Sequence, residues 1–102
     1  MQYENLKLDV YVEDDGEGAP KRIERHRVKS VYVSGVFDAT VTIEISPDHK
    51  TPIDWFPAAT AVTGGDVPAI RTFEHACKWI RVVVSNYVSG MPEVSFGGYD
   101  VV

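Results

Sequence analysis

Residues Val36–Ser46 read VFDATVTIEIS, and apolar side chains alternate there with mostly polar ones. The apolar set consists of Phe37, Ala39, Val41, Ile43 and Ile45. Because successive side chains of a β-strand point to opposite faces, this period of two places one set in a core and the other in water. The stretch therefore predicts a half-buried antiparallel strand.

Comparable patterns flank this strand on both sides. Leu6–Val12 alternates in the same way, and so does Arg27–Ser34, which Gly35 could bend or bulge where it meets the next strand. Lys78–Val88 is rich in β-branched and aromatic residues, which is typical of a central strand. Ala58–Thr63 is a further short candidate. The apolar face of the central strand is predicted to consist of Ile80, Val82 and Val84.

Turn-forming residues separate these patterns. Residues 14–22 contain Asp, Gly and Pro and predict a mobile loop, and Ser89–Pro92 predicts a tight turn into a returning hairpin strand, Glu93–Phe96. Residues 97–102 could form an edge strand or an arm that pairs with a neighbour. Thr72–Lys78 is the best helical candidate, with room for about one or two turns.

Together these patterns predict one all-β domain. A chain of 102 residues with 44% hydrophobic side chains is long enough for one core and short for two domains. Short strands separated by turns indicate an antiparallel β-sandwich, jelly-roll or immunoglobulin-like, with about seven or eight short strands. The lone Cys77 excludes a disulfide framework within the chain.

Charge and hydropathy limit the classes of partner that the protein is expected to bind. The formal net charge of −5 argues against a nucleic-acid partner, which would require an excess of Lys and Arg. The start of the chain lacks a signal-peptide pattern, and no apolar run approaches the roughly 20 residues of a membrane span. We therefore expect a protein made in the cytoplasm, with neither a nucleic-acid nor a membrane partner.

Candidate catalytic and metal sites are weak. His49, His75 and Cys77 lack the close spacing of zinc ligands and favour two loop histidines and an ordinary buried or half-buried cysteine. Asp14, Asp15 and Glu17 lack the alternate-position pattern of a calcium loop and favour a solvated loop. We expect no enzyme activity, no metal and no cofactor.

Two segments are candidate partner-binding sites. One is a basic run in an otherwise acidic chain, which could dock on an acidic partner or form a solvated strand edge, the interpretation that we favour. It contains Lys21, Arg22, Arg25, Arg27 and Lys29. The other is Trp55–Pro57, whose Trp55 and Phe56 could cap the core, which we favour, or expose an anchor. Tyr99, in the possible C-terminal arm, completes the candidate set.

Several motifs resemble small β-sandwich proteins encoded in the structural modules of tailed bacteriophages. The strand GVFDATVTIEISPD (residues 35–48), the segment Trp55–Pro57, the strand WIRV (79–82) and the turn VSG (88–90) carry this resemblance, which covers about residues 35–96. In this pattern Phe37, Val41 and Ile43 build the core, Trp55 closes one end of it, and Arg81 pairs with Glu44 or Asp48.

The resemblance implies a virion structural protein without catalytic residues. We expect a capsid decoration (cement) protein, or a related head, neck or tail component, that contacts the major capsid protein or another virion protein. A homo-oligomer, with a trimer as the working guess, is consistent with the limited core of a small domain. The alternative is a carbohydrate- or receptor-binding module of a phage tail or fibre, with Trp55, Tyr32 or Tyr87 as sugar platforms.

Overall fold

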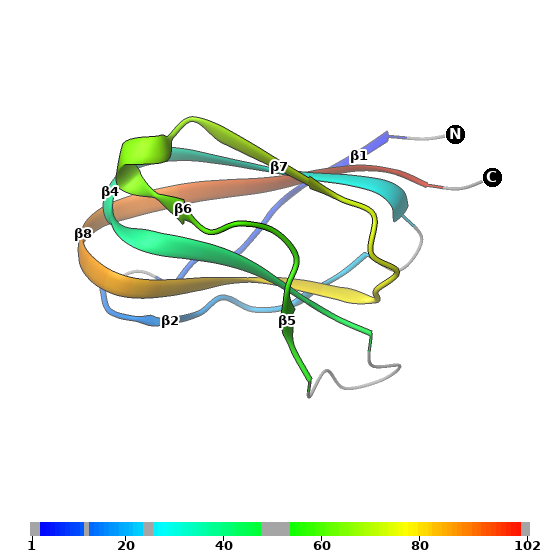
Figure 1. Ribbon diagram of the computed structural model, residues 1–102, viewed down its shortest axis with the longest axis horizontal. Coiled ribbons are helices and arrows are strands. Elements are labelled where there is room, and N and C mark those ends of the chain that lie inside the picture. The colour runs from blue at the N-terminus through cyan, green and yellow to red at the C-terminus, as the bar shows by residue number, and fades with distance from the viewer. Residues whose placement is uncertain (1–2, 12, 24–25, 48–53, 101–102) are drawn as a thin grey trace.

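Two long strands run side by side through the whole molecule. In the computed structural model, which describes residues 3–11, 13–23, 26–47 and 54–100, β4 covers His26–Ser46 and β8 covers Trp79–Asp100. They pair antiparallel from His26 opposite Asp100 to Ser46 opposite Trp79. This two-stranded ribbon bends in its middle, so that its two halves lie one above the other (Figure 1).

Shorter strands widen each half of the ribbon into a layer. Layer 1 adds β1 (Tyr3–Lys7) beside the C-terminal half of β8 and β7 (Ala69–Phe73) beside the N-terminal half of β4. Layer 2 adds β2 (Gly16–Glu17) and β3 (Lys21–Arg22) beside β8, and β5 (Phe56–Pro57) and β6 (Val62–Thr63) beside β4. A 3₁₀ turn, Gly64–Asp66, follows β6. The predicted all-β sandwich is confirmed.

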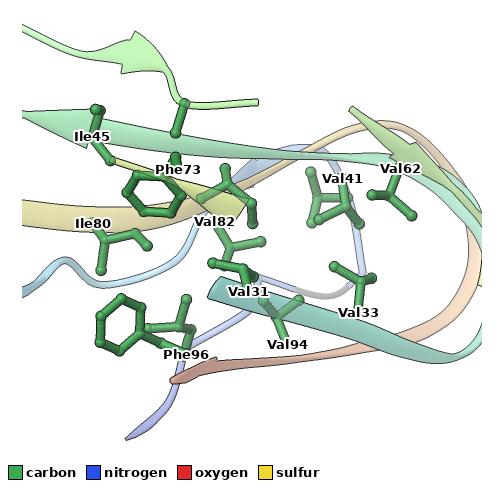
Figure 2. Close-up of a cluster of buried hydrophobic side chains, with 14 of the residues drawn as sticks. Val31, Val33, Val41, Ile45, Val62, Phe73, Ile80, Val82, Val94 and Phe96 are labelled. Carbon is green, nitrogen blue, oxygen red and sulfur yellow. The ribbon is translucent and has the colours of Figure 1, made fainter. Parts of the chain in front are cut away.

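The core fills the space between the two layers. The inward residues of β4 and β8 are those that the period of two selects, and Val41, Ile80 and Val82 are completely buried. Val31 and Val94 from layer 1 face them, as the close-up in Figure 2 shows. Burying this apolar surface is the main force that holds the layers together.

A bulge in the middle of the ribbon produces its bend. Asp38 lies opposite Ser89 and Thr40 opposite Ser85, so a single residue of β4 faces three residues of β8. Such an excess on one strand bends and twists an antiparallel pair. Gly35 and Gly90 have positive φ values of 100° and 88°, a conformation that favours glycine.

Several expected element boundaries are wrong. The predicted turn Ser89–Pro92 is paired strand, and Arg27–Ser34 and Val36–Ser46 belong to one strand, because β4 and β8 stay paired in regular register across Gly35 and Pro92. Residues 14–22 contain β2 and β3 instead of forming one open loop. Thr72–Lys78 contains no helix, since its first residues end β7.

The C-terminal segment also differs from the expectation. Residues 97–100 lie between β1 and β4 in the middle of layer 1, so they form neither an edge strand nor an arm. Val101 and Val102 lie outside the described residues. The described residues form eight strands, which agrees with the prediction, but β4 and β8, of 21 and 22 residues, are not short.

Candidate interaction surface

One residue of the predicted basic surface lies in the interior of the protein. Lys29 is only 2% exposed, and its Nζ donates hydrogen bonds to the carbonyl oxygens of Arg27, at 3.3 Å, and His75, at 2.9 Å. The inward alternation of Val31 and Val33 continues back to Lys29, which explains its orientation. The expectation that Lys29 is a surface cation is therefore wrong.

The other described cations of the run lie on strands of two different layers. In β3, Lys21 Nζ lies 3.4 Å from Asp9 Oδ2, and the Arg22 guanidinium lies 5.3 Å from the centre of the Trp79 ring. Arg27 is exposed at the start of β4, in the other layer. Arg25 lies outside the described residues. These contacts join side chains of the chain itself, and ion pairs between exposed side chains contribute little. They therefore do not identify a docking site.

Trp55 and Phe56 lie outside the core that they were expected to cap. The Trp55 ring is half-buried, with the Arg81 guanidinium 4.2 Å from its centre, and Phe56 is exposed. Arg81 projects from the outer face of layer 2, where β5 pairs along the edge of β4. The core-capping interpretation is therefore wrong, because the core is already closed by the inward residues of β4 and β8.

Arg81 organises the outer face of layer 2. Its Nε and Nη2 donate hydrogen bonds to Glu44 Oε1 at 2.9 and 2.7 Å, and its Nη1 lies 3.6 Å from Glu17 Oε1. The predicted pairing of Arg81 with Glu44 is confirmed, whereas Asp48 lies outside the described residues. Arg81 thus bridges two carboxylates on this face.

The outer face of layer 1 has a different composition. We call it the layer 1 face. It consists of the outward positions of β1, of β7, and of those halves of β4 and β8 that lie in layer 1. Its described side chains are those of Asn5, Lys7, Val28, Ser30, Tyr32, Ser34, Val36, Ile70, Thr72, Met91, Glu93, Ser95 and Tyr99. Of these, only Lys7 and Glu93 are charged, in a protein whose residues are 25% charged, and the exposed Asp38 follows Val36 at the bend.

Apolar residues on this face occur as cross-strand neighbours. Val28 lies opposite Tyr99, and Tyr32 lies opposite Ile70. The pair nearest the bend is Val36 with Met91, which are 90% and 58% exposed. Exposed apolar side chains on a surface with few charges are typical of interaction sites, and here Ser30 and Ser34 separate the three pairs. Of this set, sequence reasoning selected only Tyr99 and Tyr32.

The remaining candidate reactive groups lie apart from this face. Cys77 is buried as expected, and burial raises the pKa of its thiol, although the nearby Lys29 charge opposes the shift. His75 is exposed, and His49 lies outside the described residues. Within the described ranges, no three His, Cys, Asp or Glu residues are arranged to hold a metal ion.

The acidic loop contributes to the structure of the bend. Asp15 Oδ1 accepts a hydrogen bond from the backbone N–H of Tyr87 at 2.8 Å, and Asp14 Oδ1 accepts one from the N–H of Asp15. Tyr87 itself donates its hydroxyl hydrogen to the carbonyl oxygen of Gly90 at 2.8 Å. Asp15 thus ties the loop to the bulge of β8, whereas Asp14 bonds within the loop.

Comparison with known proteins gives no relative. No protein-family model matches the chain, and the searches of curated proteins and of solved structures returned no match. In the described parts of the chain, none of the helical structure is long and apolar enough to cross a membrane. Function must therefore be argued from the surfaces themselves.

Proposed function

We propose that this protein is a structural component of a tailed-bacteriophage virion, a decoration protein that attaches to the head through the layer 1 face. The observation that carries the proposal is the low charge of this face, on which Val28, Tyr32 and Ile70 are exposed beside cross-strand partners. The sequence motifs that resemble phage β-sandwich proteins support the same class.

The shape and chemistry of the face suit a large, rigid partner. Four neighbouring strands present a broad surface whose backbone is already ordered, so little conformational entropy is lost on binding. Tyrosines supply contact area and a hydroxyl that can bond to polar groups of the partner. The partner we propose is the major capsid protein or another virion protein, bound by a homo-oligomer such as a trimer.

The basic run has a smaller part in this proposal than the sequence suggested. Lys29 is buried and Lys21 has an acidic neighbour, so few of its charges face outward together. We therefore expect attachment to depend mainly on apolar contact, which resists salt, and only weakly on ion pairs, which salt screens.

The test compares one apolar side chain of the layer 1 face with one exposed apolar side chain at the edge of layer 2. Ile70→Asp, on the layer 1 face, should reduce cosedimentation with heads stripped of this protein by at least about tenfold, since a charge would be buried without a partner. Phe56→Asp, on layer 2, should leave cosedimentation unchanged; the two residues are 60% and 54% exposed.

Thermal melts of both variants establish that each remains folded. Equal attachment by Ile70→Asp and the unchanged protein would contradict the proposal, and loss of attachment by Phe56→Asp alone would assign the contact to layer 2. The proposal also requires the chain to be present in purified virions, which mass spectrometry detects.

A carbohydrate-binding role is the second candidate. Tyr32 and Tyr99 project from the same face. Tyr99 pairs with Val28, which lies four residues before Tyr32 on β4, so the two tyrosines are about 13 Å apart along the strand direction. Trp55 lies on the opposite layer and Tyr87 at the bend, so the aromatics first considered do not form one row. A glycan array decides between the candidates, because a decoration protein should bind no sugar.

A further inference from the structure

A cavity opens at the end of the sandwich opposite the bend. It has a volume of about 510 Å³ and lies where the chain crosses between the layers. The polar side chains in its wall are those of His26, Arg27, Lys29, Glu74, Cys77 and Lys78. They come from the start of β4 and from the segment that connects β7 to β8.

Lys29 brings a buried positive charge to this cavity. Its ammonium group donates to two backbone carbonyls, and the ring of Phe73 lies 5.6 Å away. Among the described residues, none of its contacts is with a carboxylate. An ammonium carries three N–H donors, so one remains for a further acceptor. Burying a charge without a counter-ion is costly, and an anion in the cavity would offset that cost.

His26 supplies a second buried polar group, with one ring nitrogen that makes no hydrogen bond. Its Nε2 lies 2.5 Å from Glu4 Oε1, and its ring centre lies 5.1 Å from that of Phe96. Its Nδ1 is buried and makes no hydrogen bond. Because a carboxylate only accepts, Nε2 carries the hydrogen of this bond. Nδ1 then accepts from a ligand hydroxyl when the ring is neutral, or donates to a ligand oxygen when the ring is charged.

The charges around the cavity favour an anion. Among the described residues of the wall, Arg27, Lys29 and Lys78 are cationic and Glu74 alone carries a carboxylate. Burial raises the pKa of Cys77, so its thiol stays neutral and adds no negative charge. Such a concave positive site on a protein of net charge −5 concentrates anions locally.

We propose that this cavity binds a small oxyanion, the carboxylate or phosphate group of a soluble molecule. An anionic oxygen accepts the remaining N–H of Lys29, and a neighbouring oxygen of the same group accepts the Nδ1–H of a charged His26 ring or, as a phosphate hydroxyl, donates to Nδ1 of the neutral ring. The cations Arg27 and Lys78 surround the rest of the group. This site is independent of the layer 1 face and of virion attachment.

The test measures binding of two probes to the whole protein by amide NMR. Inorganic phosphate and acetate are titrated at constant ionic strength, and shifts should saturate in residues 26–29 and 74–78. Lys29→Met should weaken binding at least about tenfold, because a charged hydrogen bond is lost. Glu74→Gln should tighten it about two- to threefold, because a repulsive charge is removed.

Matched controls lie on the layer 1 face. Lys7→Met and Glu93→Gln change the net charge by the same amounts and should leave binding unchanged. If Lys29→Met fails to fold, the comparison of Glu74→Gln with Glu93→Gln still tests whether the cavity binds the anion. Both glutamates are exposed, so neither substitution should unfold the protein.

Each outcome of the titrations either supports or overturns the oxyanion site. Saturation by phosphate alone or acetate alone assigns the chemical class of the ligand, and saturation by both supports a general oxyanion site. Absence of saturable shifts with either probe overturns the proposal. Equal weakening by Lys29→Met and Lys7→Met, or equal tightening by the two Glu variants, would also overturn it, because the effect would be one of overall charge.

Discussion

Asp66 is a surface carboxylate whose ionisation is tied to the local backbone. The backbone N–H and the Oγ1 hydroxyl of Thr63 donate to its Oδ2 at 3.1 and 2.8 Å. These bonds stabilise the charged form and hold the pKa of Asp66 below its ordinary value. Because the folded-state pKa is lowered, the stabilisation is present above the unfolded pKa and is lost as pH falls through the folded one.

Thr63→Val tests this contact. The variant removes the hydroxyl bond and keeps the backbone bond, so the pKa of Asp66 should rise part of the way toward its ordinary value. An NMR titration of the carboxyl carbon measures it, with the exposed Thr72→Val as a control that leaves the Asp66 curve unchanged. An Asp66 curve that is the same in Thr63→Val and the unchanged protein would contradict the assignment.

At the scale of elements, the bend of the β4–β8 ribbon depends on Gly90. A Cβ atom there would lie 2.2 Å from the carbonyl oxygen of Val36 and 2.5 Å from the Cα of Phe37, and the φ of 88° already disfavours other residues. We expect Gly90→Ala to lower the free energy of unfolding by about 2–4 kcal/mol, as clashes at special backbone positions do.

Gly65 provides the matched control. A Cβ built there meets no atom within 4 Å, so Gly65→Ala should change the free energy of unfolding by less than about 0.5 kcal/mol. Urea unfolding of both variants gives the comparison. Equal stability of Gly90→Ala and Gly65→Ala would show that the bend tolerates a side chain.

At the scale of the whole molecule, the two layers are held together by one shared core. Val82 is completely buried in β8, among side chains from both layers (Figure 2). Val82→Ala should therefore lower the free energy of unfolding by about 1–4 kcal/mol, through lost burial and the cavity that remains.

The same strand contains its own control. Val88 is 70% exposed, so Val88→Ala should have an effect close to zero. Chemical denaturation followed by tryptophan fluorescence measures both variants. If Val82→Ala unfolds at the same denaturant concentration as the unchanged protein, the assignment of inward and outward faces is reversed.

The sequence by itself determined which side chains enter the core. The alternation at Phe37, Val41 and Ile43 and that at Ile80 and Val82 correctly selected buried positions. Period two is a local property of the extended chain, so it can be read without knowing the partner strand. The pairing of Arg81 with Glu44 could also be predicted, because both positions lie outward on strands.

Only the tertiary structure decided where the long strands bend and which polar groups become buried. A glycine with positive φ fits both a hairpin turn and a bulged bend, and the choice at Gly90 depends on pairing with Phe37, far away in sequence. Lys29 lies on the inward side of the alternation with Val31 and Val33, but only the folded chain supplies the carbonyl oxygen of His75 that accepts its hydrogen bond and allows the charge to be buried. The layer 1 face likewise exists only because β1, β8, β4 and β7 are brought side by side, since cross-strand neighbours are set by long-range register, which the local sequence does not encode.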